Sequence, residues 1–346
     1  MTLTDALVIL VKGLVIVFAF AFGLGAALSW VERKQSALIQ DRYGPNRADI
    51  LGLRLAGLFH MIADGIKIFT KEAFIPDGAN KVLFWVAPVL TLACPLLVWI
   101  VIPFGPGPHL AISSAGTGIL ILFAISGFGI LGPVLGGWAS NNKWSLLGAM
   151  RSGAQLISYE VALGLGAIGV FLVYGSLDLQ VLTERQTGTF LGFLPNWGLF
   201  TQPLGFLVFF VAAIAENKRA PFDVVEADSE LISGYFTEYS AFGFAGFYFA
   251  EFVQMAVVAA LLSVLFLGGW QIPYVAPLTE GFGPALHAGV FIGKIVFMLW
   301  LMMMVRWTLP RFRYDQVMSV GWKGLLPAAL VNIAVTAVVL AAVVRG

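Results

Sequence analysis

Four ionisable side chains lie inside long apolar stretches of this sequence: Lys12, Glu160, Glu251 and Lys294. A charged residue at bilayer depth costs at least about 2.5 kcal/mol on insertion scales, so such residues usually carry a function. The ammonium group of Lys12 is expected to reach the outer interface along its flexible stem. Glu160, Glu251 and Lys294 are therefore the candidates for moving protons or ions through a membrane.

A second concentration of titratable groups is the segment 216–238, which holds six acids and only two bases, Lys218 and Arg219. The acids are Glu216, Asp223, Glu226, Asp228, Glu230 and Glu238. Crowded carboxylates raise one another's pKa, and groups driven toward neutrality in this way can pass protons. Together with this segment, Glu216, Glu160 and Glu251 are expected to form an acidic path toward the middle of the membrane.

The elements that position these residues must be membrane helices. The chain has 346 residues, of which 59% are hydrophobic and 11% charged, and its mean hydropathy is +0.90. Soluble domains carry about 25% charged residues, so the composition indicates an integral membrane protein. The sequence has 20 Lys and Arg and 19 Asp and Glu, so its charge is nearly balanced. Without an excess of basic residues, nucleic acid is excluded as a partner.

Cofactor ligands are scarce. The chain has one cysteine, Cys94, and its three histidines, His60, His109 and His287, lie outside the middle of any long apolar run. Iron–sulfur clusters need about four thiolates, and a structural zinc site needs about four Cys or His ligands. The pattern G-x-G-x-x-G at 164–169 falls inside an apolar helical run, where small residues serve helix packing. We therefore expect that this chain alone binds no metal and no redox cofactor.

Apolar runs long enough to cross a bilayer as helices occur eight times. They cover residues 6–30, 82–102, 118–138, 155–174, 203–215, 240–267, 286–305 and 325–344, the fifth being short for a span. No linker divides them. The sequence thus predicts an all-α integral membrane protein of about eight transmembrane helices, folded as a single polytopic domain over residues 1–346.

The basic residues sort the loops between these spans. Of the 20 Lys and Arg, 16 fall in the four odd-numbered loops. Cytoplasmic loops carry the excess of Lys and Arg. The odd loops are therefore expected to face the cytoplasm, or a mitochondrial matrix equivalent, and both termini the other side of a bacterial or mitochondrial inner membrane.

The first of these loops contains an amphipathic helix candidate at residues 53–70. His60, Asp64, Lys67 and Lys71 fall on one narrow stripe of this helix, and apolar side chains fill the rest. One interpretation is an interfacial helix lying on lipid headgroups. The narrow stripe favours the other interpretation, in which the helix is buried against protein and its stripe lines a polar cavity.

Several segments together resemble one known family. They are ERKQSALIQDRYGPN at 32–46, ADGIKIFTKE at 63–72, SYE at 158–160, AENKRAPFD at 215–223 with Glu238 and Tyr239, and RFRYDQ at 311–316. These segments are similar to the signatures of the membrane-embedded H subunit of NADH–quinone oxidoreductase, the respiratory complex I. The similarity runs from the first span to the last.

The resemblance implies a subunit of an H⁺-translocating oxidoreductase that is not catalytic alone. Its partners would be the hydrophilic subunits that hold FMN and iron–sulfur clusters, and neighbouring membrane-arm subunits. Its substrate would be a quinone entering from the bilayer. By the same resemblance, Glu32, Arg33, Asp64, Lys67 and Arg311 would line the quinone chamber. Glu216, Asp223, Glu226, Asp228 and Glu230 would couple quinone reduction to protonation, and Glu160, Glu216 and Glu251 would carry protons.

Two alternatives stay open. One is the homologous membrane subunit of a hydrogenase- or ferredoxin-linked complex, against which the fully matched segment 32–46 argues. The other is a free-standing proton-coupled transporter, which usually shows inverted repeats. The sequence has no convincing internal repeat.

Overall fold

The computed structural model describes residues 11–50, 52–107, 110, 116–225, 231–275, 277–278 and 281–345. A short β-hairpin divides its helical elements into two groups. Those before the hairpin are η1 (Val15–Phe22), α2 (Gly23–Ile39), η2 (Leu55–Gly57), α3 (His60–Thr70), α4 (Lys81–Val98), α5 (Gly118–Gly129), α6 (Leu131–Ala139), α7 (Lys143–Tyr174) and α8 (Leu179–Arg185). After the hairpin come α9 (Gly198–Thr201), α10 (Pro203–Glu216), η3 (Gly234–Phe236), α12 (Ala241–Phe266), α13 (Gly283–Thr308), α14 (Tyr314–Ser319), η4 (Val320–Leu325) and α15 (Leu326–Arg345). The hairpin pairs β1 (Thr189–Phe190) antiparallel with β2 (Leu194–Pro195), Thr189 opposite Pro195.

The described chain contains seven helices that are long and apolar enough to span a bilayer. They are Val11–Ile39, Lys81–Val98, Gly118–Ala139, Lys143–Tyr174, Ala241–Phe266, Gly283–Thr308 and Tyr314–Val343. The shorter apolar helix α10, Pro203–Glu216, coincides with the predicted fifth span. The all-α membrane fold class is thereby confirmed.

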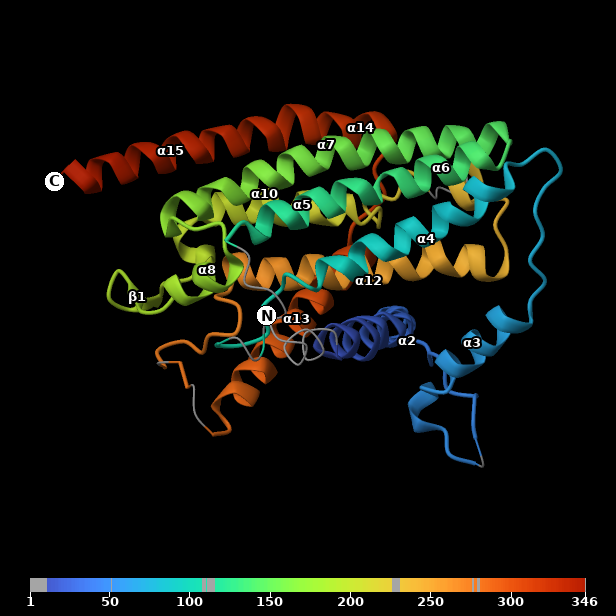
Figure 1. The fold of residues 1–346 in the computed structure, drawn as a ribbon, viewed down its shortest axis with the longest axis horizontal. Coiled ribbons are helices and arrows are strands. Elements are labelled where there is room, and N and C mark those ends of the chain that lie inside the picture. The colour runs from blue at the N-terminus through green and yellow to red at the C-terminus, as the bar shows by residue number, and fades with distance from the viewer. Residues whose placement is uncertain are drawn as a thin grey trace.

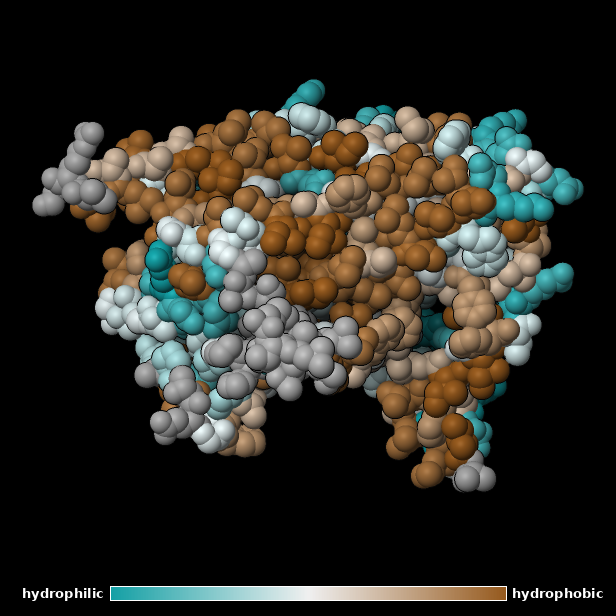
Figure 2. Space-filling model, viewed as in Figure 1, coloured by the Kyte–Doolittle hydropathy of each residue, from teal (hydrophilic) through white to brown (hydrophobic). Residues whose placement is uncertain are grey.

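Helix α12 forms the centre of the bundle. In its most apolar stretch 89% of the residues are buried, against 17% in the first and last spans. It packs against α2, α4, α10 and α13, and Figure 1 shows α4, α5, α7 and α15 stacked on one side of it. The space-filling view shows a broad apolar band over these helices and hydrophilic residues near the end where α4, α7 and α12 begin (Figure 2). Most side chains of α12 from Ala250 onward are therefore buried inside the bundle.

Within the glycine pattern at 164–169, Gly166 and Gly169 lie at close helix contacts, as expected, whereas a Cβ at Gly164 would meet nothing within 4 Å. A Cβ on Gly169 would lie 2.5 Å from the side-chain oxygen of Gln202 and 2.6 Å from the amide of Asn332. Those two side chains hydrogen-bond to each other at 2.9 Å, between the start of α10 and α15. Because Gly169 has no side chain, the buried hydrogen bond between Gln202 and Asn332 packs directly against α7.

The helix predicted at 53–70 differs from the observed one in two respects. It begins at His60, because Ala56 (φ 54°) and Gly57 (φ 84°) adopt left-handed backbone that ends any earlier turn. The expectation that it is buried against protein is wrong for the chain by itself, since α3 buries none of its residues. Figure 1 shows α3 set apart from the stacked helices, beside α2 and the start of α12.

Candidate functional site

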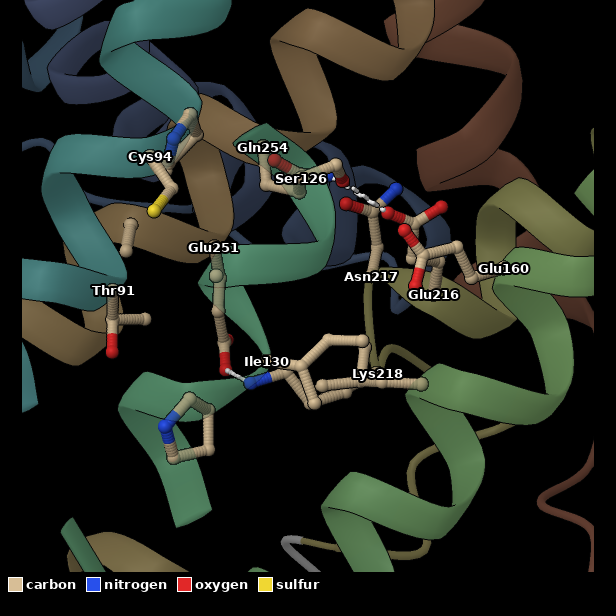
Figure 3. A pocket seen from close by; sticks show the side chains of 15 residues that line it. Thr91, Cys94, Ser126, Ile130, Glu160, Glu216, Asn217, Lys218, Glu251 and Gln254 are labelled. Carbon is tan, nitrogen blue, oxygen red and sulfur yellow. Dashed lines mark hydrogen bonds and ion pairs between the residues drawn. The ribbon is translucent and has the colours of Figure 1, made fainter. Parts of the chain in front are cut away.

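A polar cavity lies inside the bundle where α4, α5, α6, α7, α10 and α12 meet. Glu160 of α7, Glu216 at the end of α10 and Glu251 of α12 all line it. Figure 3 shows the carboxylates of Glu160 and Glu216 side by side, with Thr91 and Cys94 on the opposite wall. The space open to water-sized molecules is about 60 Å³, which holds a few waters. Three acids far apart in sequence therefore share one partly open cavity.

Glu216 is buried, with 8% of its surface exposed. Its Oε1 accepts hydrogen bonds from Ser126 Oγ at 3.1 Å and from Gln254 Nε2 at 3.1 Å (Figure 3). Glu160 reaches the same place because Gly127 faces it. A Cβ at Gly127 would stand 3.2 Å from a Glu160 carboxylate oxygen. Two carboxylates that face each other in this way favour a shared proton.

On another wall of the cavity, Glu251 is accompanied by a lysine and a tyrosine. Lys218 Nζ lies 3.7 Å from Glu251 Oε1 and donates a hydrogen bond of 2.9 Å to the hydroxyl of Tyr235. The Tyr235 hydroxyl in turn donates to Glu251 Oε1 at 3.3 Å. Among the described residues that line the cavity, Lys218 is the one cation.

A second charged cluster centres on Glu32 of α2. Its carboxylate pairs with both Arg219, on the loop after α10, and Arg306, in the last turn of α13. Burial works against the charge of Arg219, yet Glu32 and Glu251 outweigh it and raise the arginine pKa above its ordinary value. Glu32 and Arg219 are both buried, so each charge depends on the other.

Two further ion pairs lie near the surface of this region. Arg33 Nη2 is 2.7 Å from Asp64 Oδ2 of α3, and both side chains are about two-fifths exposed. Arg311 Nη2 is 2.8 Å from Asp223 Oδ2. Burial raises the pKa of the Asp223 carboxyl above its usual range, although Arg311 acts in the opposite direction.

Partly exposed aromatic rings extend from this cluster along the start of α12. Phe242, Phe244 and Tyr248 each keep more than a third of their surface exposed, and Phe69 of α3 packs edge-on against Phe242. Tyr248 lies near enough to Glu32, Arg33, Arg219 and Arg306 to interact with their charges. An apolar strip therefore ends at a set of fixed charges.

The comparisons with known proteins decide the family. A family model described as NADH dehydrogenase matches residues 11–337. The chain belongs to the NADH dehydrogenase family. It is 46% identical over 328 residues to the H subunit of the NADH-quinone oxidoreductase of Thermomicrobium roseum, covering 92% of each chain. The protein of the same name from Flavobacterium johnsoniae is 40% identical over 345 residues, covering 96% of this chain and 95% of that protein.

Membership of this family confirms the motif resemblance, and the relatives are subunits of an enzyme complex. The structure brings the predicted residues together in part. Glu160, Glu216 and Glu251 share the cavity, while Glu32, Arg33, Asp64 and Arg311 each form an ion pair outside it. Lys67 is exposed on α3. Glu226, Asp228, Glu230 and His109 lie outside the described residues.

Several side chains of this family member were not assigned a role from sequence. Arg219 and Arg306 complete the Glu32 cluster, and Lys218 and Tyr235 accompany Glu251. The one signal available was that Lys218 and Arg219 are the only bases in the acidic segment. Tyr235 gave no signal, because an aromatic residue among apolar neighbours is usually core.

Lys294 is held by the backbone. Its Nζ donates to the carbonyl oxygens of Leu267 at 2.6 Å, Gly269 at 2.9 Å and Gln271 at 2.6 Å, and lies 4.4 Å from the centre of the Trp197 ring. Leu267 directly follows α12. This ammonium group therefore caps the end of the central helix. Among the residues that the structure describes, no group of three or more His, Cys, Asp or Glu is arranged to hold a metal ion.

Proposed function

We propose that this chain is the membrane subunit of a proton-pumping NADH–quinone oxidoreductase, in which it forms much of the quinone-access chamber and couples quinone reduction to proton translocation. The names of its relatives support the enzyme, and the motifs at 32–46 and 215–223 support the quinone branch over a hydrogenase- or ferredoxin-linked complex. Electrons would come from FMN and iron–sulfur clusters in partner subunits.

One observation carries the proposal: four consecutive residues connect the two charged sites. Glu216 lines the cavity, whereas Arg219 pairs with Glu32 beside the aromatic strip of α12. The backbone between them therefore belongs to both sites. A change of charge at the Glu32 cluster therefore alters the electric field at the cavity. The two sites are close in the chain, and low-dielectric protein surroundings screen charges poorly.

The quinone would lie with its isoprenoid tail along Phe242, Phe244 and Phe69 and its head toward the charged end. Reduction by two electrons builds negative charge on the head, which Arg33, Lys67 and Arg311 can stabilise from the chamber and its mouth. The acids of the loop, Asp223, Glu226, Asp228 and Glu230, would respond to that charge by changing protonation. Glu216, Glu160 and Glu251 would pass the proton into the membrane.

The location that fits this role is a bacterial inner membrane or its mitochondrial equivalent. The odd loops would face the cytoplasm or matrix and both termini the opposite side, as the Lys and Arg distribution favours. The partners would be the hydrophilic cluster-bearing subunits on the inner side, neighbouring membrane-arm subunits and the lipid bilayer. Exposed apolar side chains on α3, including Ile62 and Ile66, would meet one of those subunits.

The test uses the complete complex in liposomes, with Glu216→Gln and Glu160→Gln as separate variants. Each substitution keeps the shape and removes the titratable proton. We expect proton pumping to fall by about tenfold or more in each, as when a relay acid is lost. The measurements are NADH-driven quinone reduction and proton uptake by the same vesicles. Glu72→Gln is the matched control, because Glu72 is exposed at the surface.

If both variants retain full quinone reduction and full pumping, the acidic path is wrong. The transporter alternative makes a different prediction. A transporter would move protons when purified alone, whereas this chain is expected to co-purify with cluster-bearing subunits and to be inactive without them.

A further inference from the structure

The three acids of the cavity differ in how their charges are balanced. Glu160 and Glu216 face each other with Ser126 and Gln254 as neutral partners of Glu216. Glu251 alone has a cation at close range, since Lys218 Nζ is 3.7 Å away. Figure 3 shows Lys218 reaching across the cavity to Glu251 and away from the Glu160–Glu216 pair. Of these three acids, Glu251 is therefore the one whose negative charge is balanced by Lys218.

Lys218 is built into this position. It is buried, with 6% of its surface exposed, and its backbone adopts a left-handed φ of 52°. Its ammonium lies 4.6 Å from the centre of the Tyr235 ring and donates to the Tyr235 hydroxyl at 2.9 Å. A buried lysine held at three points is oriented, which a solvated surface lysine is not.

The partners of Lys218 also link the cavity to the loop that follows it. Tyr235 belongs to η3, at the far end of the acidic segment, and its ring is fully buried among Phe236 and Phe247. Arg219, the next residue after Lys218, is engaged with Glu32. A displacement of Arg219 or of η3 therefore moves Lys218 relative to Glu251.

We propose that Lys218 is a positioning residue that gates Glu251: its ammonium holds Glu251 as a compensated carboxylate, and Glu251 accepts a proton only when Lys218 withdraws. This inference rests on the proposed proton-pumping function. A proton arriving from a cavity water or a neighbouring carboxylic acid bonds to a Glu251 oxygen, and its charge replaces that of the lysine. No electron or other reactant is required. The link to Arg219 makes this exchange responsive to the Glu32 cluster.

The experiment compares Lys218→Met and Lys218→Arg in the complete complex. In Lys218→Met the buried carboxylate loses its nearest cation, and the remaining cation near it, Arg219, stays paired with Glu32. Glu251 should therefore be protonated at rest. We expect an additional infrared C=O stretch of a protonated carboxylic acid, and about a tenfold loss of protons pumped per quinone reduced. Lys218→Arg should show neither change, because it keeps the charge. Lys81→Met, at an exposed lysine, is the control for removing a lysine.

A second comparison identifies which acid is protonated, and it keeps the test valid if Lys218→Met assembles poorly. The infrared band of Lys218→Met should be absent from Lys218→Met combined with Glu251→Gln, and this double variant should assemble at least as well as Lys218→Met. The proposal is overturned if no band appears in Lys218→Met, if the band survives the second substitution, or if the two substitutions act additively on assembly. These readouts are independent of the Glu216→Gln and Glu160→Gln pumping test, so the two proposals can fail separately.

Discussion

Glu32 and Arg219 form a buried ion pair although 187 residues separate them in the sequence. The carboxylate of Glu32 is shared with Arg306, so one acid balances two cations from two other elements. This contact fixes α2, the loop after α10 and the end of α13 to one another.

Replacing Glu32 with Gln should destabilise the assembled complex by about 3–5 kcal/mol, because it leaves the buried Arg219 without a counter-charge. The amount of intact complex in native gels and its thermal inactivation midpoint measure this loss. Glu72→Gln is a suitable control at an exposed glutamate. An unchanged midpoint in Glu32→Gln would mean that water or another acid compensates Arg219.

Arg33 should act on the quinone rather than on folding. Its pair with Asp64 is about two-fifths exposed on both sides, so Arg33→Ala should cost no more than about 1 kcal/mol of stability. We expect a raised KM for quinone and unchanged electron transfer from NADH to a water-soluble acceptor. Steady-state kinetics with both acceptors checks this. Equal losses with the two acceptors would place the defect outside the quinone chamber.

Stability should depend on pH through Asp223. The pKa of the Asp223 carboxyl is higher in the folded protein than its ordinary value of 3.8. Its full contribution to folding stability is therefore present below pH 3.8. That contribution is lost as the pH rises through the raised pKa. Asp223→Asn should therefore gain unfolding temperature relative to the parent as the pH rises. Arg311→Met should be most harmful at high pH, where Asp223 is charged. Thermal unfolding at several pH values measures both, and parallel pH profiles would contradict the assignment.

The contact between α6 and α7 should tolerate no side chain at Gly137. A Cβ there would overlap the Ser145 carbonyl oxygen, whereas a Cβ at Gly164 meets nothing within 4 Å. Gly137→Ala is expected to destabilise by roughly 1–3 kcal/mol. Gly164→Ala should be neutral or gain up to about 1 kcal/mol. The yields of assembled complex and their thermal midpoints should separate the two variants, and similar behaviour would contradict the close approach.

Lys294 should matter for assembly and not for the quinone. Lys294→Met would leave the carbonyls of Leu267, Gly269 and Gln271 without this donor, at a cost of about 3 kcal/mol. The thermal midpoint should fall while the KM for quinone in the surviving complex stays the same. A loss of proton pumping in a fully stable Lys294→Met complex would instead indicate a direct role in transport.

The course of α3 shows where sequence patterns reached their limit. Its polar stripe is real, since Asp64 pairs with Arg33 and His60 accepts a hydrogen bond from the Ala48 amide. The helix begins later than its periodicity suggests, because Ala56 and Gly57 adopt left-handed backbone. Gly57 also approaches Pro45 so closely that a Cβ would not fit there. Its exposed apolar side was not predictable, because an apolar residue looks the same whether its own chain or a partner covers it.

Hydropathy and the rarity of charge by themselves determined the membrane class, the spans and the short fifth helix, because the transfer of a helix into lipid is a nearly additive property of neighbouring residues. The motifs determined the family. Only the tertiary structure decided which acid has which partner: Lys218 with Glu251, Arg219 with Glu32, and Glu216 with Ser126. Such pairings join residues from distant segments, and their energies depend on distance and burial, which no local pattern encodes.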